Sequence, residues 1–109
     1  MSDNVVMHDN RAQNRYEIKV GDEVAGFTLY YLEGDRIALV HTEVDVAYEG
    51  QGLGGRLARH ALDDARKRGL RVTPSCPFFK RYIGMHPEYK DLVRTGEKPR
   101  RVVLGDLGD

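Results

Sequence analysis

The seven-residue segment Glu49-Gly50-Gln51-Gly52-Leu53-Gly54-Gly55 is the part of this chain best suited to binding an anion. It follows an extended apolar run, residues 37–40, and leads directly into an amphipathic helical pattern. The first N–H groups of a helix have no partner within the helix, and the aligned peptide dipoles give that end a partial positive charge. Glycines let a large anion approach these groups closely. The segment therefore predicts a phosphate-binding turn between a strand and a helix.

A glycine-rich turn can also be a tight connection in which glycine is needed only for its backbone dihedrals. The composition of the following helix favours an anion. Arg56 and Arg59 lie in its first two turns and Asp63 and Asp64 come later, the reverse of the order that a helix dipole favours. The spacing fits neither a nucleotide-hydrolysing P-loop nor the Gly-x-Gly-x-x-Gly dinucleotide motif.

Cys76 is a candidate reactive thiol. Pro77 suits the first position of a helix, so Cys76 is expected at the N-cap, where the helix end stabilises a thiolate. A lone cysteine can equally be a small buried residue with an inert thiol. The four histidines and the single cysteine have no metal-ligand spacing, so we expect no metal site.

His41 and Glu43 are two residues apart on a predicted strand and should therefore share one face of the sheet. We expect Ile37 and Leu39 to continue that face, which would be buried at one end and polar at the other. A histidine can take up a proton near neutral pH, so His41 is a candidate general base. A hydrogen-bonded structural histidine is the alternative.

Strands and helices that would position these groups can be predicted from periodicity and turn residues. We expect a short first strand, three further strands in an antiparallel meander, a long helix, a fifth short strand parallel to the fourth, and short C-terminal helices, which together make a mixed, mostly antiparallel α/β (α+β) fold. Six apolar residues of the long helix form a stripe that should pack on the sheet: Leu53, Leu57, Ala58, Ala61, Leu62 and Ala65. The expected strands cover residues 5–8, 16–20, 24–32, 36–44 and 70–73, and the expected helices cover residues 52–68, 78–85 and 87–93.

Length and composition limit the function classes. The chain of 109 residues is expected to form one domain over residues 1–93, with a polar, flexible tail over residues 94–109. With 17 basic and 17 acidic residues, the net charge of zero does not favour nucleic acid or an anionic membrane as partner. The chain has no apolar run of about 20 residues and no signal-peptide pattern, and its single cysteine suggests a cytoplasmic protein.

The chain resembles the GNAT N-acetyltransferase superfamily. The resemblance lies in a meander that leads into Val44-x-x-x-x-Glu49-Gly50-Gln51-Gly52-Leu53-Gly54, followed by helix, strand and helix. The segments Cys76-Pro77-Phe78 and His86-Pro87-Glu88-Tyr89 are similar to those of a compact single-domain subfamily.

This resemblance implies that acetyl-CoA is the cosubstrate. Its pyrophosphate would bind backbone amides of the glycine turn: Gly50, Gln51, Gly52, Leu53, Gly54 and Gly55. Its pantetheine arm would lie where the fourth and fifth strands splay apart and pair with the fourth strand at Thr42, Val44 and Val46. The acetyl group would then lie near Cys76 and Tyr82, and the resemblance makes Tyr82 the general acid that protonates the departing sulfur, although Tyr82 can also simply pack against aromatic neighbours.

Two departures from the superfamily pattern affect the functional hypothesis. Glu49 stands where the superfamily has Gln or Arg, and only residues 11–15 stand where helices usually shape the acceptor pocket. We expect an N-acetyltransferase that transfers an acetyl group to an amine. The alternatives are a non-catalytic acyl-CoA sensor and an interaction domain without a ligand.

Overall fold

The structure is a computed structural model that describes residues 4–94, and its centre is a five-stranded sheet in the order β1-β2-β3-β4-β5. All neighbouring strands are antiparallel except β4 and β5, which are parallel and are connected by the long helix α1. The strands are β1 (Val5–Asn10), β2 (Arg15–Val20), β3 (Glu23–Glu33), β4 (Arg36–Val44) and β5 (Arg71–Pro74). The helices are η1 (Val46–Tyr48), α1 (Leu53–Lys67), α2 (Pro77–Met85), η2 (Pro87–Tyr89) and α3 (Lys90–Arg94).

This architecture confirms the predicted fold class. The expected elements are present with ends that differ by one or two residues in most cases, and β4 matches the predicted range. The predicted polar tail, residues 94–109, lies outside the described residues except for Arg94, which ends α3.

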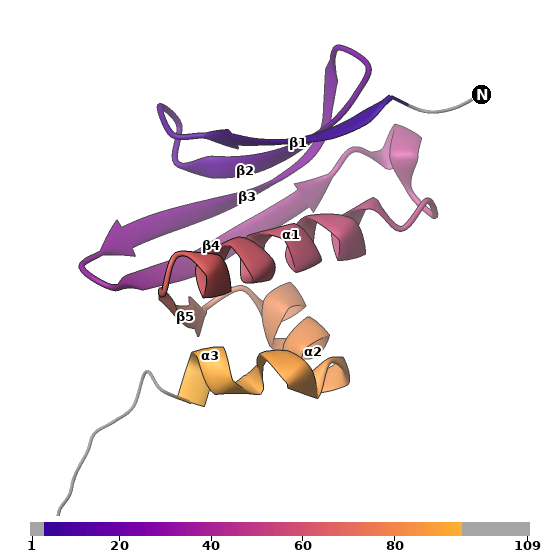
Figure 1. Ribbon diagram of the computed structural model, residues 1–109. Helices are drawn as coiled ribbons and strands as arrows, with labels where there is room; N and C mark the ends of the chain where they lie inside the picture. Colours follow the sequence, from indigo (N-terminus) through magenta and orange to yellow (C-terminus); the bar gives the residue numbers. More distant parts are fainter. Residues whose placement is uncertain (1–3, 95–109) are drawn as a thin grey trace, which may run out of the picture.

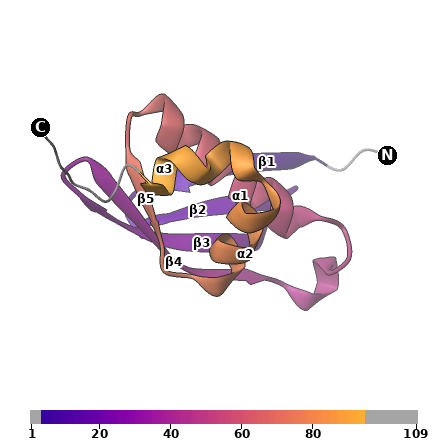
Figure 2. The same ribbon diagram turned by 90° about the horizontal axis from the view of Figure 1, so that it is seen from below.

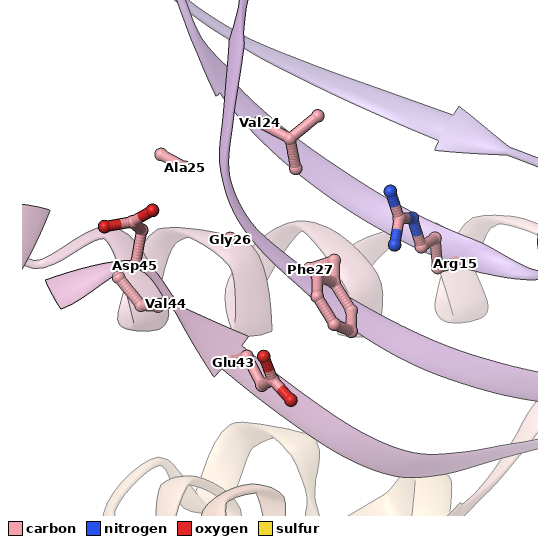
Figure 3. Close-up of a pocket in the computed structure, with 8 residues that line it drawn as sticks. All are labelled: Arg15, Val24, Ala25, Gly26, Phe27, Glu43, Val44 and Asp45. Atoms are coloured by element: carbon pink, nitrogen blue, oxygen red, sulfur yellow. The ribbon is translucent and has the colours of Figure 1, made fainter. Parts of the chain in front are cut away.

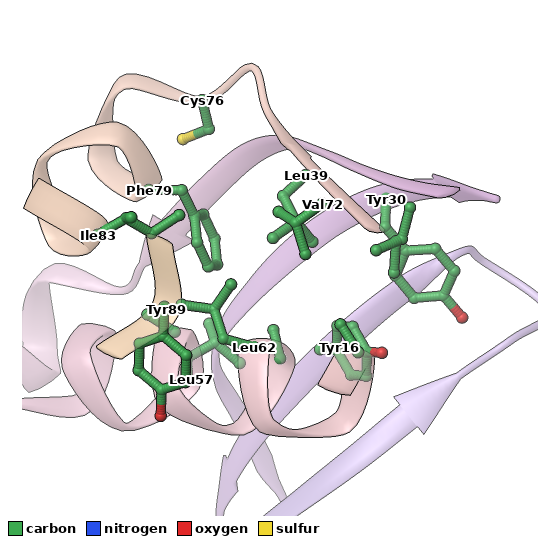
Figure 4. Packing of buried hydrophobic residues seen from close by; sticks show 14 of the residues in the cluster. Tyr16, Tyr30, Leu39, Leu57, Leu62, Val72, Cys76, Phe79, Ile83 and Tyr89 are labelled. Carbon is green, nitrogen blue, oxygen red and sulfur yellow. The ribbon is translucent and has the colours of Figure 1, made fainter. Parts of the chain in front are cut away.

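The helices α1, α2 and α3 lie on the same side of the sheet (Figures 1 and 2). The predicted stripe of α1 is buried against the sheet, and Ile18, Tyr30 and Leu39 are among the sheet residues that meet it. Phe79 and Ile83 of α2 complete the same core (Figure 4). In residues 4–94 no helix covers the opposite face of the sheet, which we call the open face. None of the described helices is long and apolar enough to cross a membrane.

One expectation about β4 is wrong. The register between β3 and β4 shifts, so that Leu29 pairs with His41 while Tyr30 pairs with Leu39, which leaves Val40 as a bulge. A bulge adds one residue to one strand and thereby reverses which side chains face each side of the sheet. Ile37 and Leu39 point into the core, but His41 and Glu43 do not continue their face. Thr42 and Val44 take over the helix side, whereas His41 and Glu43 lie on the open face.

Candidate active site

The strands β4 and β5 diverge halfway along β4. Their pairing ends at Leu39 and Pro74, and the backbone N–H of Cys76 then donates to the carbonyl of Leu39 at 2.9 Å. Residues 41–44 of β4 pair with β3 on one side, and within residues 4–94 no strand pairs with their other side. An unpaired strand edge offers N–H and carbonyl groups to a ligand that carries amides.

The glycine turn leaves the start of α1 uncapped. Gly52 is the N-cap with a φ of 74°, no side chain caps the helix, and the first turn contains no acidic residue. Gly50 has a φ of 82°, so both residues adopt a left-handed conformation that favours glycine. Leu53 has a buried side chain, while Gln51 is exposed. The backbone N–H groups at this end are therefore available to an anion.

Gly54 and Gly55 are not required by the packing of the chain itself. A Cβ added to Gly54 would lie 3.5 Å from Cζ of Phe78 and 3.8 Å from Cγ2 of Val44, and one added to Gly55 would lie 4.0 Å from Cε1 of Tyr82. These are ordinary contact distances, and neither glycine has a positive φ. Glycine at these two positions leaves the space at the start of α1, beside Phe78 and Tyr82, free of side-chain atoms from this helix end. An anion placed at the start of α1 would meet backbone N–H groups and no side chain of Gly54 or Gly55.

Cys76 is the N-cap of α2, with Pro77 at the first helical position, as the sequence predicts. Its side chain is buried, with 5 % of the residue exposed, and its Sγ lies 3.7 Å from Oγ1 of Thr42. The hydroxyl of Thr42 is in turn 3.0 Å from the hydroxyl of the buried Thr28. Figure 4 shows the sulfur at the start of α2, above Phe79. The thiol thus lies at the end of the diverging strands, next to the helix side of β4.

Tyr82 lies further along α2, beside the start of α1. Its ring stacks on that of His86, with 4.1 Å between ring centroids, and it lies close to Gly55. Burial raises the pKa of the Tyr82 hydroxyl, which therefore keeps its proton at neutral pH. Six residues of helix separate Tyr82 from Cys76 by about 9 Å along the axis, and no contact between the two is found in residues 4–94.

His41 is separated from these groups by the β4 backbone. Its Nε2 lies 2.7 Å from Oε2 of Glu43, and both side chains are exposed on the open face. The histidine ring also lies near Phe27, with 6.3 Å between centroids. The structure therefore brings Cys76 together with Thr42 on the helix side of β4, which Val44 shares, and does not bring His41 to them. Val46 lies just beyond β4, in η1, and is 77 % exposed.

The open face carries a groove that the sequence did not predict (Figure 3). It has a volume of about 290 Å³ and is lined by side chains and backbone of β2, β3 and β4: Arg15, Val24, Ala25, Gly26, Phe27, Glu43, Val44 and Asp45. We call it the open-face groove. Its lining combines one guanidinium, one aromatic ring and two carboxylates.

Arg15 is held in this groove by Glu17 and Phe27. Its Nε donates to Oε2 of Glu17 at 2.7 Å, and its guanidinium carbon lies 4.6 Å from the centre of the Phe27 ring. Glu17 is only 3 % exposed and also accepts from Nδ2 of Asn10 at 3.0 Å. Burial alone would raise the pKa of Glu17, but the hydrogen bonds from Asn10 and Arg15 outweigh it and hold that pKa below its ordinary value. The one sequence signal for this pair was the i,i+2 spacing of an arginine and a glutamate in a strand.

Among residues 4–94 no group of three His, Cys, Asp or Glu side chains could hold a metal ion.

A mixed sheet with one parallel pair that diverges beside a glycine turn defines the acetyltransferase class of fold, and residues 15–92 match the family model described as GCN5-related N-acetyl-transferase. The chain belongs to this family. Protein NATD1 of Mus musculus is 33% identical over 91 residues, which cover 82% of this chain and 82% of that protein. Protein NATD1 of Homo sapiens is also 33% identical, over 82% of this chain and 80% of that protein.

Solved structures agree with this assignment. The solution structure of a GCN5-like protein from Staphylococcus aureus has a TM-score of 0.64 and 26% identity, covering 84% of this chain and 89% of that one. A GNAT family acetyltransferase from Elizabethkingia anophelis, solved with acetyl-CoA bound, has a TM-score of 0.56 and 16% identity, covering 79% of this chain and 76% of that one. At that identity the second likeness shows the fold alone.

Proposed function

We propose that this chain binds acetyl-CoA and transfers the acetyl group to an amine. The observation that carries the proposal is the uncapped, glycine-rich start of α1 beside the unpaired edge of β4. Family membership supports the same reaction class. The backbone N–H groups of Gly50, Gln51, Gly52, Leu53, Gly54 and Gly55 would hold the pyrophosphate.

The unpaired edge of β4 would hold the pantetheine arm. The backbone at Thr42 and Val44 offers groups that match the two pantetheine amides, and Val46, largely exposed, would contact the ligand near the glycine turn. Acetyl-CoA supplies the acetyl group as a thioester. Holding this thioester and an amine side by side lowers the entropic cost of their reaction.

The groups available for proton transfer lie on both sides of this edge. Cys76 and Tyr82 are on the helix side, and the hydroxyl of Tyr82 is protonated at neutral pH and can donate that proton. His41, hydrogen-bonded to Glu43, lies on the open face as a candidate base for the ammonium form of the acceptor. The neutral amine nitrogen bonds to the thioester carbon, the bond from that carbon to sulfur breaks, and the sulfur takes a proton from Tyr82 or Cys76. The proton that the new amide nitrogen loses passes through solvent and restores this donor.

A non-catalytic acyl-CoA sensor is favoured by one observation. Glu49 directly precedes the glycine turn and is exposed, and a carboxylate near a pyrophosphate is repulsive unless it turns away. Weak or unproductive binding would follow from that repulsion. Incubation with acetyl-CoA and a broad panel of amines, while free thiol is followed, separates the two functions, because a sensor binds without turnover.

A bulky side chain in the space between β4 and α2 tests the proposed acetyl-CoA site. The variant Gly54→Leu places a side chain between Val44 and Phe78, and it should weaken acetyl-CoA binding in calorimetry by about tenfold or more. The matched control is Gly84→Leu on α2, where an added Cβ meets nothing within 4 Å and binding should stay unchanged. The absence of any heat at millimolar acetyl-CoA, with Gly54→Leu equal to the unmodified chain, would overturn both the enzyme and the sensor.

A further inference from the structure

The open-face groove has opposite charges on either side of an aromatic floor. Arg15 covers the ring of Phe27, while Glu43 is the direct cross-strand partner of Phe27 in β4 (Figure 3). Arg15 and Glu43 both line the groove, yet none of the ion pairs found in residues 4–94 joins them. The positive and negative groups are thus held apart by the ring and are not neutralised by each other.

The guanidinium of Arg15 is fixed for binding. Only its Nε is used by Glu17, and no hydrogen bond from its two terminal nitrogens is found in the part of the chain that the structure describes. Two parallel N–H donors of a fixed guanidinium match a carboxylate in a bidentate arrangement. The ion pair with the buried Glu17 orients the guanidinium of Arg15, which lines the open-face groove.

The opposite side of the groove suits a cation. Glu43 and Asp45 bring two carboxylates to the lining, and Glu43 holds the candidate base His41 at 2.7 Å. This side follows the part of β4 whose other edge is unpaired, where the thioester would lie under the proposed function. An ammonium group bound by Glu43 would therefore be next to both the base and the acetyl donor.

We propose that the open-face groove holds the acetyl acceptor, and that this acceptor is a small molecule with a carboxylate in addition to the reacting amine. Arg15 binds the carboxylate, Phe27 and Val24 contact the intervening carbon atoms, and Glu43 binds the ammonium. The volume of about 290 Å³ accommodates an amino acid-sized molecule. This inference rests on the proposed function, because that function supplies the acetyl donor beside β4. The transfer itself is the amine acetylation described above, and the carboxylate takes no part in bond making.

Matched ligand pairs test this proposal. Glycine, β-alanine and γ-aminobutyrate differ in chain length, and methylamine, ethylamine and propylamine are their counterparts without the carboxylate. We expect the best amino acid to shift the backbone NMR signals of Phe27 and Glu43 and to bind about tenfold or more tightly than its counterpart. The titration is run with and without saturating coenzyme A, so that binding to the open-face groove is measured even if coenzyme A does not bind.

Variants of Arg15 and Glu43 test whether these residues recognise the carboxylate and the ammonium of the acceptor. Arg15→Gln should remove the preference for the carboxylate while the plain amines keep their affinity. Arg11→Gln on the same hairpin is the control, because Arg11 is exposed and pairs only with Asp9 among the described ion pairs. Arg15→Gln leaves Glu17 buried without its cation, which destabilises the fold. Glu43→Gln is therefore the second variant. Its side chain is exposed, and it should weaken binding of the amino acid and of the plain amine alike.

The outcomes separate this proposal from the proposed function. Equal binding of amino acids and plain amines, or no binding of either, overturns the acceptor class even where coenzyme A binds normally. Absence of coenzyme A binding overturns the proposed function, and the titration without nucleotide then still decides whether the groove recognises an amino acid.

Discussion

Cys76 lies at the N-cap of α2, next to the hydroxyl of Thr42 on β4. The sulfur donates to Thr42 Oγ1, and Thr42 is anchored on the buried Thr28. The side chain is buried among apolar residues, which is also the environment of an inert structural cysteine. The geometry is compatible with a reactive thiol and with a structural cysteine. The turnover of Cys76 variants distinguishes the two roles.

We predict that Cys76→Ser and Cys76→Ala lower the turnover number by about 10²-fold or more if the thiol protonates the departing sulfur. The dissociation constant of acetyl-CoA should change by no more than about twofold, because the expected phosphate contacts come from backbone amides. Steady-state kinetics and calorimetry on the same preparations measure the two quantities, and thermal unfolding checks that each variant is folded. Unchanged turnover in both variants removes Cys76 from the mechanism.

At the scale of elements, the bulge of β4 determines which of its residues lie on the helix side and which lie on the open face. Without the additional residue Val40, the side chains of His41 and Glu43 would lie on the helix side and Thr42 on the open face. The bulge therefore gives Cys76 a hydroxyl neighbour and leaves the His41–Glu43 pair on the open-face groove. A single strand thereby presents different chemistry to each side of its unpaired edge.

Much of the element order could be predicted from the sequence, because each element has a local signal. The apolar stripe of α1, Pro77 at the start of α2 and Gly69 after α1, with a φ of 70°, are all read from neighbouring residues. The bulge could not be predicted, because it depends on how β4 pairs with β3 and not on β4 alone. The Arg15–Glu17 pair was missed for the same reason, since Asn10 of β1 and Phe27 of β3 complete its surroundings.

Gly26 controls the distance between β3 and β4. A Cβ at this position would lie 2.8 Å from the carbonyl oxygen of Glu43 and 3.1 Å from Cγ2 of Val44, so the backbone of β4 would have to move. We predict that Gly26→Ala lowers the free energy of unfolding by about 1–3 kcal/mol. Chemical denaturation measures the change, and the variant should also bind acetyl-CoA more weakly because β4 is displaced.

The control for Gly26→Ala is Gly84→Ala, an exposed helical glycine whose added Cβ meets nothing within 4 Å. Alanine there should leave the free energy of unfolding unchanged or raise it by up to about 1 kcal/mol. Equal stability of Gly26→Ala and the unmodified chain would show that the two strands tolerate a wider separation.

At the scale of the whole molecule, one carboxylate on each side of the sheet, the buried Glu17 and the half-buried Asp64, connects neighbouring elements. Glu17 on the open face accepts from Arg15 and Asn10, whereas Asp64 of α1 accepts from Tyr16 of β2 at 2.6 Å and from Arg68 at 3.2 Å. Burial alone would raise the pKa of Asp64, but the hydrogen bonds from Tyr16 and Arg68 outweigh it and lower that pKa. Glu17 is shifted in the same direction. One carboxylate thus joins strands to each other, and the second joins the helix to the sheet.

The lowered pKa values of Glu17 and Asp64 make the free energy of unfolding depend on pH. A carboxyl group whose pKa is lower in the folded than in the unfolded chain stabilises the fold above its unfolded pKa, about 4, and loses that contribution as the pH falls through the folded pKa. We predict that the free energy of unfolding is constant from neutral pH to about pH 5 and falls below about pH 4. Urea denaturation at a series of pH values measures this curve. Asp64→Asn and Glu17→Gln should each be less stable than the unmodified chain at neutral pH and should each have a shallower acid decline, because neither amide titrates. An acid decline in both variants as steep as in the unmodified chain would assign the pH dependence to other carboxylates.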